Sequence, residues 1–176
     1  MLLITLFLFI GFLTTLPFSI VTNNIILEII TITLGVSLYH FVMRLLVGTI
    51  VNSIMNNKGN PGCFWFREKS FEDKLYKFLR VRNWKKYVPT YDPEIFNTSN
   101  KSVEELIGAT CQAELVHEVI IVLSLAPILL IPFLGGAIAF IVTSILSMLI
   151  DLVFVIIQRY NRPRLIRVKS RFDRLK

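Results

Sequence analysis

Charged side chains are missing from two long stretches of this 176-residue chain. No Asp, Glu, Lys or Arg occurs at residues 1–27 or 119–150, and only 18% of all residues are charged. Apolar residues make up 54% of the chain, and the mean hydropathy is +0.64. This composition excludes a disordered chain and an ordinary soluble domain, because apolar blocks of such length are typical of membrane spans.

Cysteine and the common nucleotide and hydrolase motifs are also scarce or absent. Cys63 and Cys111 form no CxxC pair, so a structural zinc site is not expected. Both are expected to be reduced if the region around them is cytoplasmic. The absence of Walker, GxGxxG, GxSxG and HExxH motifs argues against nucleotide hydrolysis, a bound dinucleotide, a serine hydrolase and a zinc protease.

Four apolar segments are predicted to be membrane-spanning helices, at residues 1–21, 25–55, 112–134 and 137–157. The first lacks a basic n-region and a small-residue cleavage site, so we expect a retained span rather than a signal peptide. Polar residues 22–24 and the Pro-Gly segment 131–136 separate the spans. The predicted fold class is therefore all-α, a polytopic membrane protein with four helices in two hairpins.

Positive charge is confined almost entirely to two regions. Of 19 Lys and Arg residues, ten lie at residues 58–101 and eight at residues 159–176, and the net charge is +7. Such a layout marks the cytoplasmic side of a membrane and does not indicate a nucleic-acid partner. The predicted division is hairpin one at 1–55, a basic cytoplasmic or interfacial loop at 56–111, hairpin two at 112–157 and a basic tail at 158–176, with both termini cytoplasmic.

The loop is expected to contain an amphipathic helix. Residues 70–73 are predicted to cap a helix reaching about Val81, with one apolar face suited to the membrane surface, formed by Phe71, Leu75, Phe78 and Leu79. Pro89 and Pro93 frame an irregular stretch. Residues 102–105, Ser-Val-Glu-Glu, are predicted to form a capping box that begins the next helix.

Ionisable residues within spans are costly and usually functional. Glu114, His117 and Glu118 are spaced i, i+3, i+4 and share one helix face. A carboxylate that orients an imidazole is the arrangement of a general base. The alternative is a solvated polar helix entrance. A di-iron site needs a second ExxH motif and more carboxylates, so no metal is expected.

His40 and Arg44 form a second i, i+4 pair, within the second span. One interpretation is a buried polar pair that holds helices together. The other is a second half of the His117 site, in which His40 takes part in catalysis and Arg44 binds substrate or stabilises an oxyanion.

The end of the fourth span carries three arginines within six residues. Arg159, Arg162 and Arg164 fit a clamp for phosphate or carboxylate, with Asn161 between them and Pro163 expected to end the regular helix. The alternative is anchoring of the span at the cytoplasmic face. Trp84, in a basic stretch of the loop, fits either an interfacial anchor or a substrate-binding lid.

Three segments resemble the glycosyl-4,4'-diaponeurosporenoate acyltransferase family: Val81–Lys85, Gln112–His117 and, as the most specific, Gln158–Leu165. The resemblance covers roughly residues 40–165. It implies a small bacterial cell-membrane enzyme that esterifies a sugar hydroxyl of a carotenoid glucoside with a fatty acyl group. It also implies a site formed by Glu114, His117 and the arginines at 159–164, whereas His40 and Arg44 match a broader pattern.

The resulting hypothesis is O-acyl transfer at the cytoplasmic face, with His117 as the general base. The donor would be acyl-CoA or acyl carrier protein, the acceptor a glycolipid or lipid-linked sugar, and no bound cofactor is expected. Cys111 as a covalent acyl carrier is a weaker alternative. A non-enzymatic scaffold that recruits a partner or anionic lipid through its basic loop, and a transporter subunit, also remain open, as does an oligomer.

Overall fold

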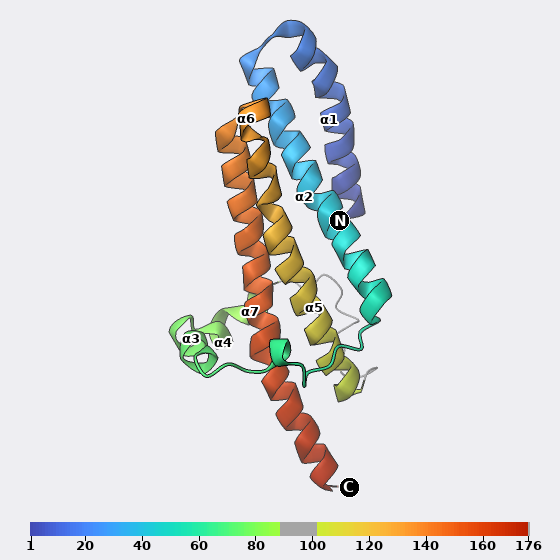
Figure 1. Ribbon diagram of the computed structural model, residues 1–176, viewed down its shortest axis with the longest axis vertical. Helices are drawn as coiled ribbons and strands as arrows, with labels where there is room; N and C mark the ends of the chain where they lie inside the picture. The colour runs from blue at the N-terminus through green and yellow to red at the C-terminus, as the bar shows by residue number, and fades with distance from the viewer. Residues whose placement is uncertain (89–101, 176) are drawn as a thin grey trace. The chain divides into compact units, whose positions relative to one another are not determined.

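The computed structural model describes residues 1–88 and 102–175, which are mostly helical and contain no β-strand (Figure 1). Within these described residues, four helical segments are long and apolar enough to cross a membrane, at Leu2–Thr22, Ile25–Met55, Val103–Leu134 and Ala137–Arg174. A lipid-embedded backbone must satisfy its own hydrogen bonds, and apolar segments of this length do so as helices. The prediction of an all-α membrane protein is confirmed at this level.

The long helices are joined and flanked by short elements. The long ones are α1 (Leu2–Thr22), α2 (Ile25–Met55), α5 (Val103–Ser124) and α7 (Ala137–Leu175). Between them lie the 3-10 turns η1 (Phe64–Phe66), η2 (Lys85–Tyr87) and η4 (Ala126–Leu130) and the helices α3 (Glu72–Phe78), α4 (Val81–Trp84) and α6 (Ile131–Leu134). The predicted Pro89 and Pro93 segment lies outside the described residues.

The breaks between spans fall where the sequence predicts them. Asn23 has φ 46°, and the side chain of Asn24 accepts a hydrogen bond from the Ile26 amide at 2.9 Å, which begins α2. Gly135 and Gly136 have φ 65° and 60° and separate α6 from α7. Glycine occupies this left-handed region without the steric cost that a side chain adds.

The capping box at the start of α5 is confirmed. The Glu105 amide donates to the Ser102 hydroxyl at 3.2 Å, and the Ser102 amide donates to the Glu105 carboxylate at 2.9 Å. This reciprocal pair satisfies two of the amides that a helix start leaves without an intrahelical partner.

The predicted loop helix is shorter than expected. It ends at Phe78 rather than near Val81, and no side chain caps its start. Arg80 has φ 50°, which interrupts the helix before α4 begins at Val81. Val81 is fully buried and belongs to one core cluster with Tyr76 and Tyr160. The packing of Val81 in this cluster explains why the helix is interrupted at Arg80.

The prediction that Pro163 ends the last helix is wrong, because α7 continues through Pro163 to Leu175 (Figure 1). Proline removes one backbone hydrogen bond from a helix interior. The neighbouring Arg159 and Arg162 are anchored by side-chain contacts to other segments, and these contacts hold the helix in place across the lost bond.

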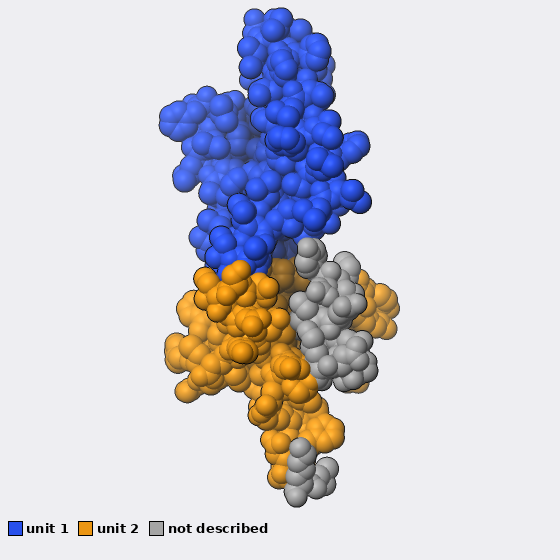
Figure 2. All heavy atoms as spheres, turned by 90° about the vertical axis from the view of Figure 1, so that its right-hand side faces the viewer, with its two compact units in different colours: residues 1–50, 118–152 blue, residues 51–117, 153–176 orange. Residues whose placement is uncertain are grey.

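The chain divides into two compact units (Figure 2). Unit 1 comprises residues 1–50 and 118–152, and unit 2 comprises residues 51–117 and 153–176. In unit 1, α1 packs on α2, where a Cβ added at Gly35 would meet the Phe12 ring at 2.9 Å. Unit 2 contains the short helices and a core of Tyr76, Val81 and Tyr160.

Candidate functional site

Glu114 lies at the centre of a buried polar network in unit 2. Its side chain is 0% exposed, and it projects from α5. One carboxylate oxygen accepts from Nη1 of Arg159 at 2.5 Å, and the other accepts from Nη2 of Arg162. Both arginines come from α7, so this double ion pair fastens α5 to α7. A buried carboxylate is tolerated because both oxygens are paired with cations.

Arg159 connects α7 to three other segments. Its Nε and Nη2 donate to one carboxylate oxygen of Glu72 at 3.0 and 2.7 Å. Nη1 and Nη2 also donate to the backbone carbonyls of Trp65 and Arg67 at 3.3 and 3.2 Å. The side chain is 17% exposed. The arginine that the sequence predicts as a ligand clamp therefore already holds two carboxylates of the chain itself.

Arg162 is more deeply buried, with its side chain 2% exposed. Besides Glu114, its guanidinium contacts the hydroxyl and carbonyl of Thr110, both at 3.3 Å, and the Phe66 carbonyl at 2.8 Å. All three of its guanidinium nitrogens are thus engaged within the protein. This contact set is that of a structural arginine, while its predicted role in substrate binding stays a prediction.

Glu72 and Tyr76 complete the network, and sequence analysis missed both. Glu72 is 3% exposed, and its second carboxylate oxygen accepts from the Tyr76 hydroxyl at 2.6 Å. Burial, together with the hydrogen bond to Glu72, raises the pKa of Tyr76 well above its ordinary value. The i, i+4 spacing of the two residues is the only signal in the sequence, and Glu72 equally fits the helix start predicted at residues 70–73.

His117 lies one turn after Glu114 on the same helix. Its ring stacks on Phe154 of α7, with the centroids 4.7 Å apart and the planes 10° from parallel. The helical face predicted for Glu114, His117 and Glu118 is present, because all three belong to α5. Glu118 is the first residue of the unit 1 segment, whereas Glu114 and His117 belong to unit 2.

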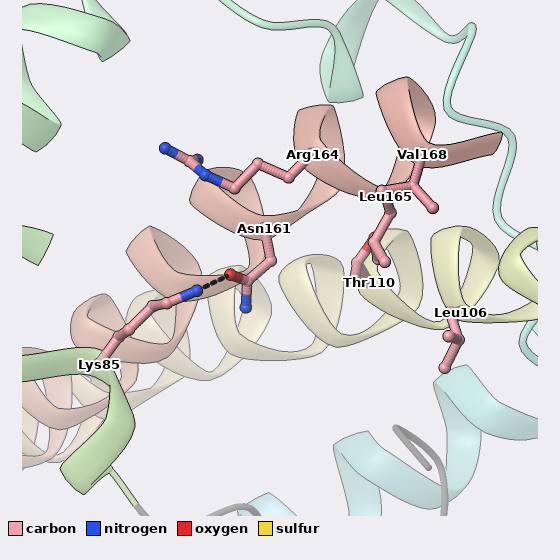
Figure 3. Close-up of a pocket in the computed structure, with 7 residues that line it drawn as sticks. All are labelled: Lys85, Leu106, Thr110, Asn161, Arg164, Leu165 and Val168. Carbon is pink, nitrogen blue, oxygen red and sulfur yellow. Dashed lines mark hydrogen bonds between the residues drawn. The ribbon is translucent and has the colours of Figure 1, made fainter. Parts of the chain in front are cut away.

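A second group of predicted residues lines a cavity of about 320 Å³ in unit 2 (Figure 3). Lys85 reaches toward α7 and donates to the side-chain oxygen of Asn161 at 2.7 Å. The Arg164 guanidinium lies 3.4 Å from the centroid of the Tyr160 ring. Burial and, to a smaller extent, the nearby charge of Arg164 lower the pKa of Lys85.

Trp84 is partly buried against the unit 2 core and does not point freely outward. Its indole Nε1 donates to the carbonyl of Leu79 at 2.8 Å. This places Trp84 among packing residues, and a role as a substrate lid stays a prediction.

His40 and Arg44 belong to a polar cluster in unit 1. Arg44 donates to Asp151 at 2.5 Å and to the Ser147 hydroxyl at 2.8 Å, and Ser147 in turn contacts Ser124 at 2.9 Å. His40 is 4% exposed, and neither ring nitrogen has a hydrogen-bond partner among the described residues. The contacts of Arg44 with Asp151 and Ser147 join α2 to α7, as interhelical polar contacts do in membranes, whereas a catalytic role of His40 stays a prediction.

The predicted site residues thus fall into two sets. Unit 1 holds His40 and Arg44, and unit 2 holds Glu114, His117 and the three arginines. A site that joins the two sets stays a prediction. No group of three His, Cys, Asp or Glu residues suited to a metal ion occurs within residues 1–88 and 102–175.

Comparison with known proteins adds a family assignment. A family model described as glycosyl-4,4'-diaponeurosporenoate acyltransferase matches residues 63–171. This range contains Glu114, His117 and the three arginines, and it excludes His40 and Arg44. No curated protein and no solved structure matches the chain. Because the match covers more than half of the chain, the protein belongs to the glycosyl-4,4'-diaponeurosporenoate acyltransferase family and is a membrane acyltransferase.

Proposed function

We propose that the protein transfers an acyl group from a thioester donor to a hydroxyl of a glycolipid or lipid-linked sugar. The family supplies the reaction type and its name indicates a glycosylated acceptor. The observation that carries the proposal is the buried network of Glu114, Arg159 and Arg162, which fixes the turn of α5 that bears His117.

His117 is the proposed general base. Its imidazole takes the proton from the acceptor hydroxyl, whose oxygen forms a bond to the thioester carbonyl carbon. The carbon–sulfur bond then breaks, and the imidazolium returns its proton to the leaving thiolate. Glu114 acts as a positioning residue, because its carboxylate is held by two guanidinium groups one helical turn from the imidazole. Stacking on Phe154 restricts the tilt of the His117 ring.

The proposed arrangement in the membrane places the chemistry at the cytoplasmic face. In it, α1 with α2 and α5 with α7 form two hairpins, and the basic loop and tail lie in the cytoplasm. Ten cations at residues 58–101 and eight at residues 159–176 support this orientation. A thioester donor made in the cytoplasm then reaches unit 2 without crossing the membrane.

Mass spectrometry of lipid and saccharide extracts tests the proposal. Cells that contain the protein are compared with cells that lack it and with cells that make the His117→Ala variant. We expect a product that is heavier by one acyl group in the first sample and absent from both others, and its mass identifies the acceptor. A His117→Ala variant that makes the full amount of product contradicts the proposed mechanism.

The alternative function is a non-enzymatic scaffold, and the same comparison of cells with and without the protein and with His117→Ala tests it. The loop exposes Phe64, Trp65, Phe78 and Tyr87 beside many cations, a pattern that also fits attachment to anionic lipid. Binding of lipid that is unaffected by His117→Ala, with no acylated product in any sample, favours the scaffold.

A further inference from the structure

A second hollow of unit 2 is strongly cationic. It has a volume of about 370 Å³, and its lining includes one acidic residue, Asp73, and four basic ones, namely Lys77, Arg80, Arg82 and Arg164. Tyr76, Asn83 and Tyr160 complete the lining. Four cations against one carboxylate leave a net positive charge that attracts a polyanion.

The local fold explains why these cations meet. Arg80 has φ 50°, a conformation uncommon for a residue with a side chain, and it forms the tight turn between α3 and α4. This turn brings Lys77, from the last turn of α3, to the same hollow as Arg82 of α4. Arg164 joins them from α7, where its guanidinium lies on the Tyr160 ring and donates to the Tyr160 carbonyl.

These cations differ from the buried arginines of the network. Arg159 and Arg162 are neutralised by Glu72 and Glu114. Within residues 1–88 and 102–175, no carboxylate forms an ion pair with the side chains that line the cationic hollow at Lys77, Arg80 and Arg82. Their charge is therefore available to a ligand.

The cationic hollow adjoins the cavity of about 320 Å³, since Arg164 lines both. That cavity has an apolar wall of Leu106, Leu165 and Val168 and polar groups on Lys85, Thr110 and Asn161 (Figure 3). Each hollow has the size of a small-molecule site, about 300–1,000 Å³. A ligand with several phosphates and a slender, amide-bearing arm matches the two together.

We infer that these adjoining hollows bind the coenzyme A part of an acyl-CoA donor. The phosphates contact Lys77, Arg80, Arg82 and Arg164 of the cationic hollow. The pantetheine arm lies along the apolar wall of the adjoining cavity of about 320 Å³. Thr110 lines that cavity and contacts Arg162 of the network. His117 is seven residues further along α5, about 10 Å at the helical rise. The inference rests on the proposed acyl transfer and names its donor.

Charge favours coenzyme A over a phospholipid headgroup as the source of phosphate. Coenzyme A carries a diphosphate and a separate 3'-phosphate, whereas a phosphatidylglycerol headgroup carries a single phosphodiester. The positive charge of four cations is matched by the phosphates of coenzyme A and exceeds the charge of a single phosphodiester. Arginine also pairs with phosphate in a bidentate manner, which suits the three arginines of the hollow.

Equilibrium binding of coenzyme A to the full-length protein tests the inference without requiring catalysis. The protein is placed in nanodiscs of phosphatidylcholine alone or mixed with phosphatidylglycerol. The variants are Arg80→Gln with Arg82→Gln, and a matched control, Arg171→Gln with Arg174→Gln, which removes two exposed cations of the C-terminal segment. A second ligand, 3'-dephospho-coenzyme A, lacks one phosphate.

We expect the Arg80 and Arg82 double variant to raise the Kd of coenzyme A about tenfold or more, because two charge-assisted contacts are lost. The Arg171 and Arg174 control keeps the Kd within about twofold at physiological salt. Removal of the 3'-phosphate weakens binding to the wild type more than to the double variant.

Three results of the binding experiment overturn the inference. They are no binding of coenzyme A, equal weakening by both double variants, and displacement of coenzyme A by phosphatidylglycerol, which would assign the hollow to a lipid headgroup. Transfer from an acyl carrier protein without coenzyme A binding also overturns this inference and leaves the proposed function intact. Full activity of His117→Ala, in contrast, overturns the proposed mechanism and leaves coenzyme A binding untouched.

Discussion

The carboxylate of Glu114 has the most demanding surroundings in unit 2. It is fully buried, and each of its oxygens receives a guanidinium donor. Removing one partner of a buried ion pair leaves the other charge without compensation, which costs far more than the net contribution of the intact pair. Glu114 therefore supports the packing of α5 on α7 one helical turn before His117.

The Glu114→Gln variant is expected to lose about 3–5 kcal/mol of stability, because Arg159 and Arg162 would retain their charge at a neutral amide. Thermal unfolding of the purified protein in detergent measures this loss as a lower midpoint. Glu28→Gln is the matched control, since Glu28 is exposed on α2, and its midpoint should stay unchanged. Equal midpoints for Glu114→Gln and Glu28→Gln would disprove the structural role of the network.

At this scale the sequence predicts the helix that carries Glu114 and His117 better than it predicts their contacts. The spacing of Glu114 and His117 places both on one turn of α5, as the structure has it. The partners of Glu114 were not predictable, because the sequence shows Arg159 and Arg162 only as cations at a helix end. Long-range pairing with Glu72 depends on the packing of the short loop helices, and no local pattern encodes it.

Close packing of a loop on a helix is the clearest feature at the scale of elements. A Cβ added at Gly108 of α5 would lie 2.2 Å from the backbone oxygen of Asn57, and one at Gly59 would lie 2.4 Å from the Cβ of Cys111. The Asn57 amide donates to the Gln112 side chain at 2.7 Å across this contact. Glycine is required here because backbone meets backbone, and not because of unusual dihedral angles.

Gly108→Ala is expected to destabilise the protein by about 1–3 kcal/mol, because the added methyl group must displace backbone atoms of the Asn57 turn. Gly48→Ala is the matched control in α2, where an added Cβ meets nothing within 4 Å. The control should gain about 0.5–1 kcal/mol from the better helix former. Comparing the two unfolding midpoints decides the matter, and equal shifts in the same direction would refute the close contact.

The elements themselves were largely predictable, and the exceptions have physical causes. Uninterrupted apolar runs predict the spans, and the capping box predicts the start of α5. The low helix propensity of proline led to the wrong prediction that the last helix ends at Pro163. The tertiary contacts of Arg159 and Arg162 outweigh the one hydrogen bond that is lost there. The end of α3 was missed because the burial of Val81 requires the turn at Arg80.

Orientation in the membrane is a property of the whole molecule. The long uncharged stretches define the spans, and the cations gather in the loop and the tail. Cys63 reports on the side of the loop, since it is an exposed free thiol, whereas Cys111 is buried.

A membrane-impermeant maleimide should label Cys63 in inside-out vesicles and not in intact cells, because the loop is predicted to be cytoplasmic. Mass spectrometry of the recovered protein measures the labelling, and the Cys63→Ser variant should show none because Cys111 is shielded. Labelling of Cys63 in intact cells would contradict the proposed orientation and place the loop outside the cell.

The central claim is that chemistry resides at His117 while the Glu114 network supplies the framework. The most direct measurement is the acyl-transfer rate of His117→Phe, determined together with its thermal unfolding midpoint. Phenylalanine keeps an aromatic ring to stack on Phe154 and removes the base. We expect an unchanged unfolding midpoint and a transfer rate that is reduced at least about 100-fold. A folded His117→Phe variant with the wild-type rate would contradict it.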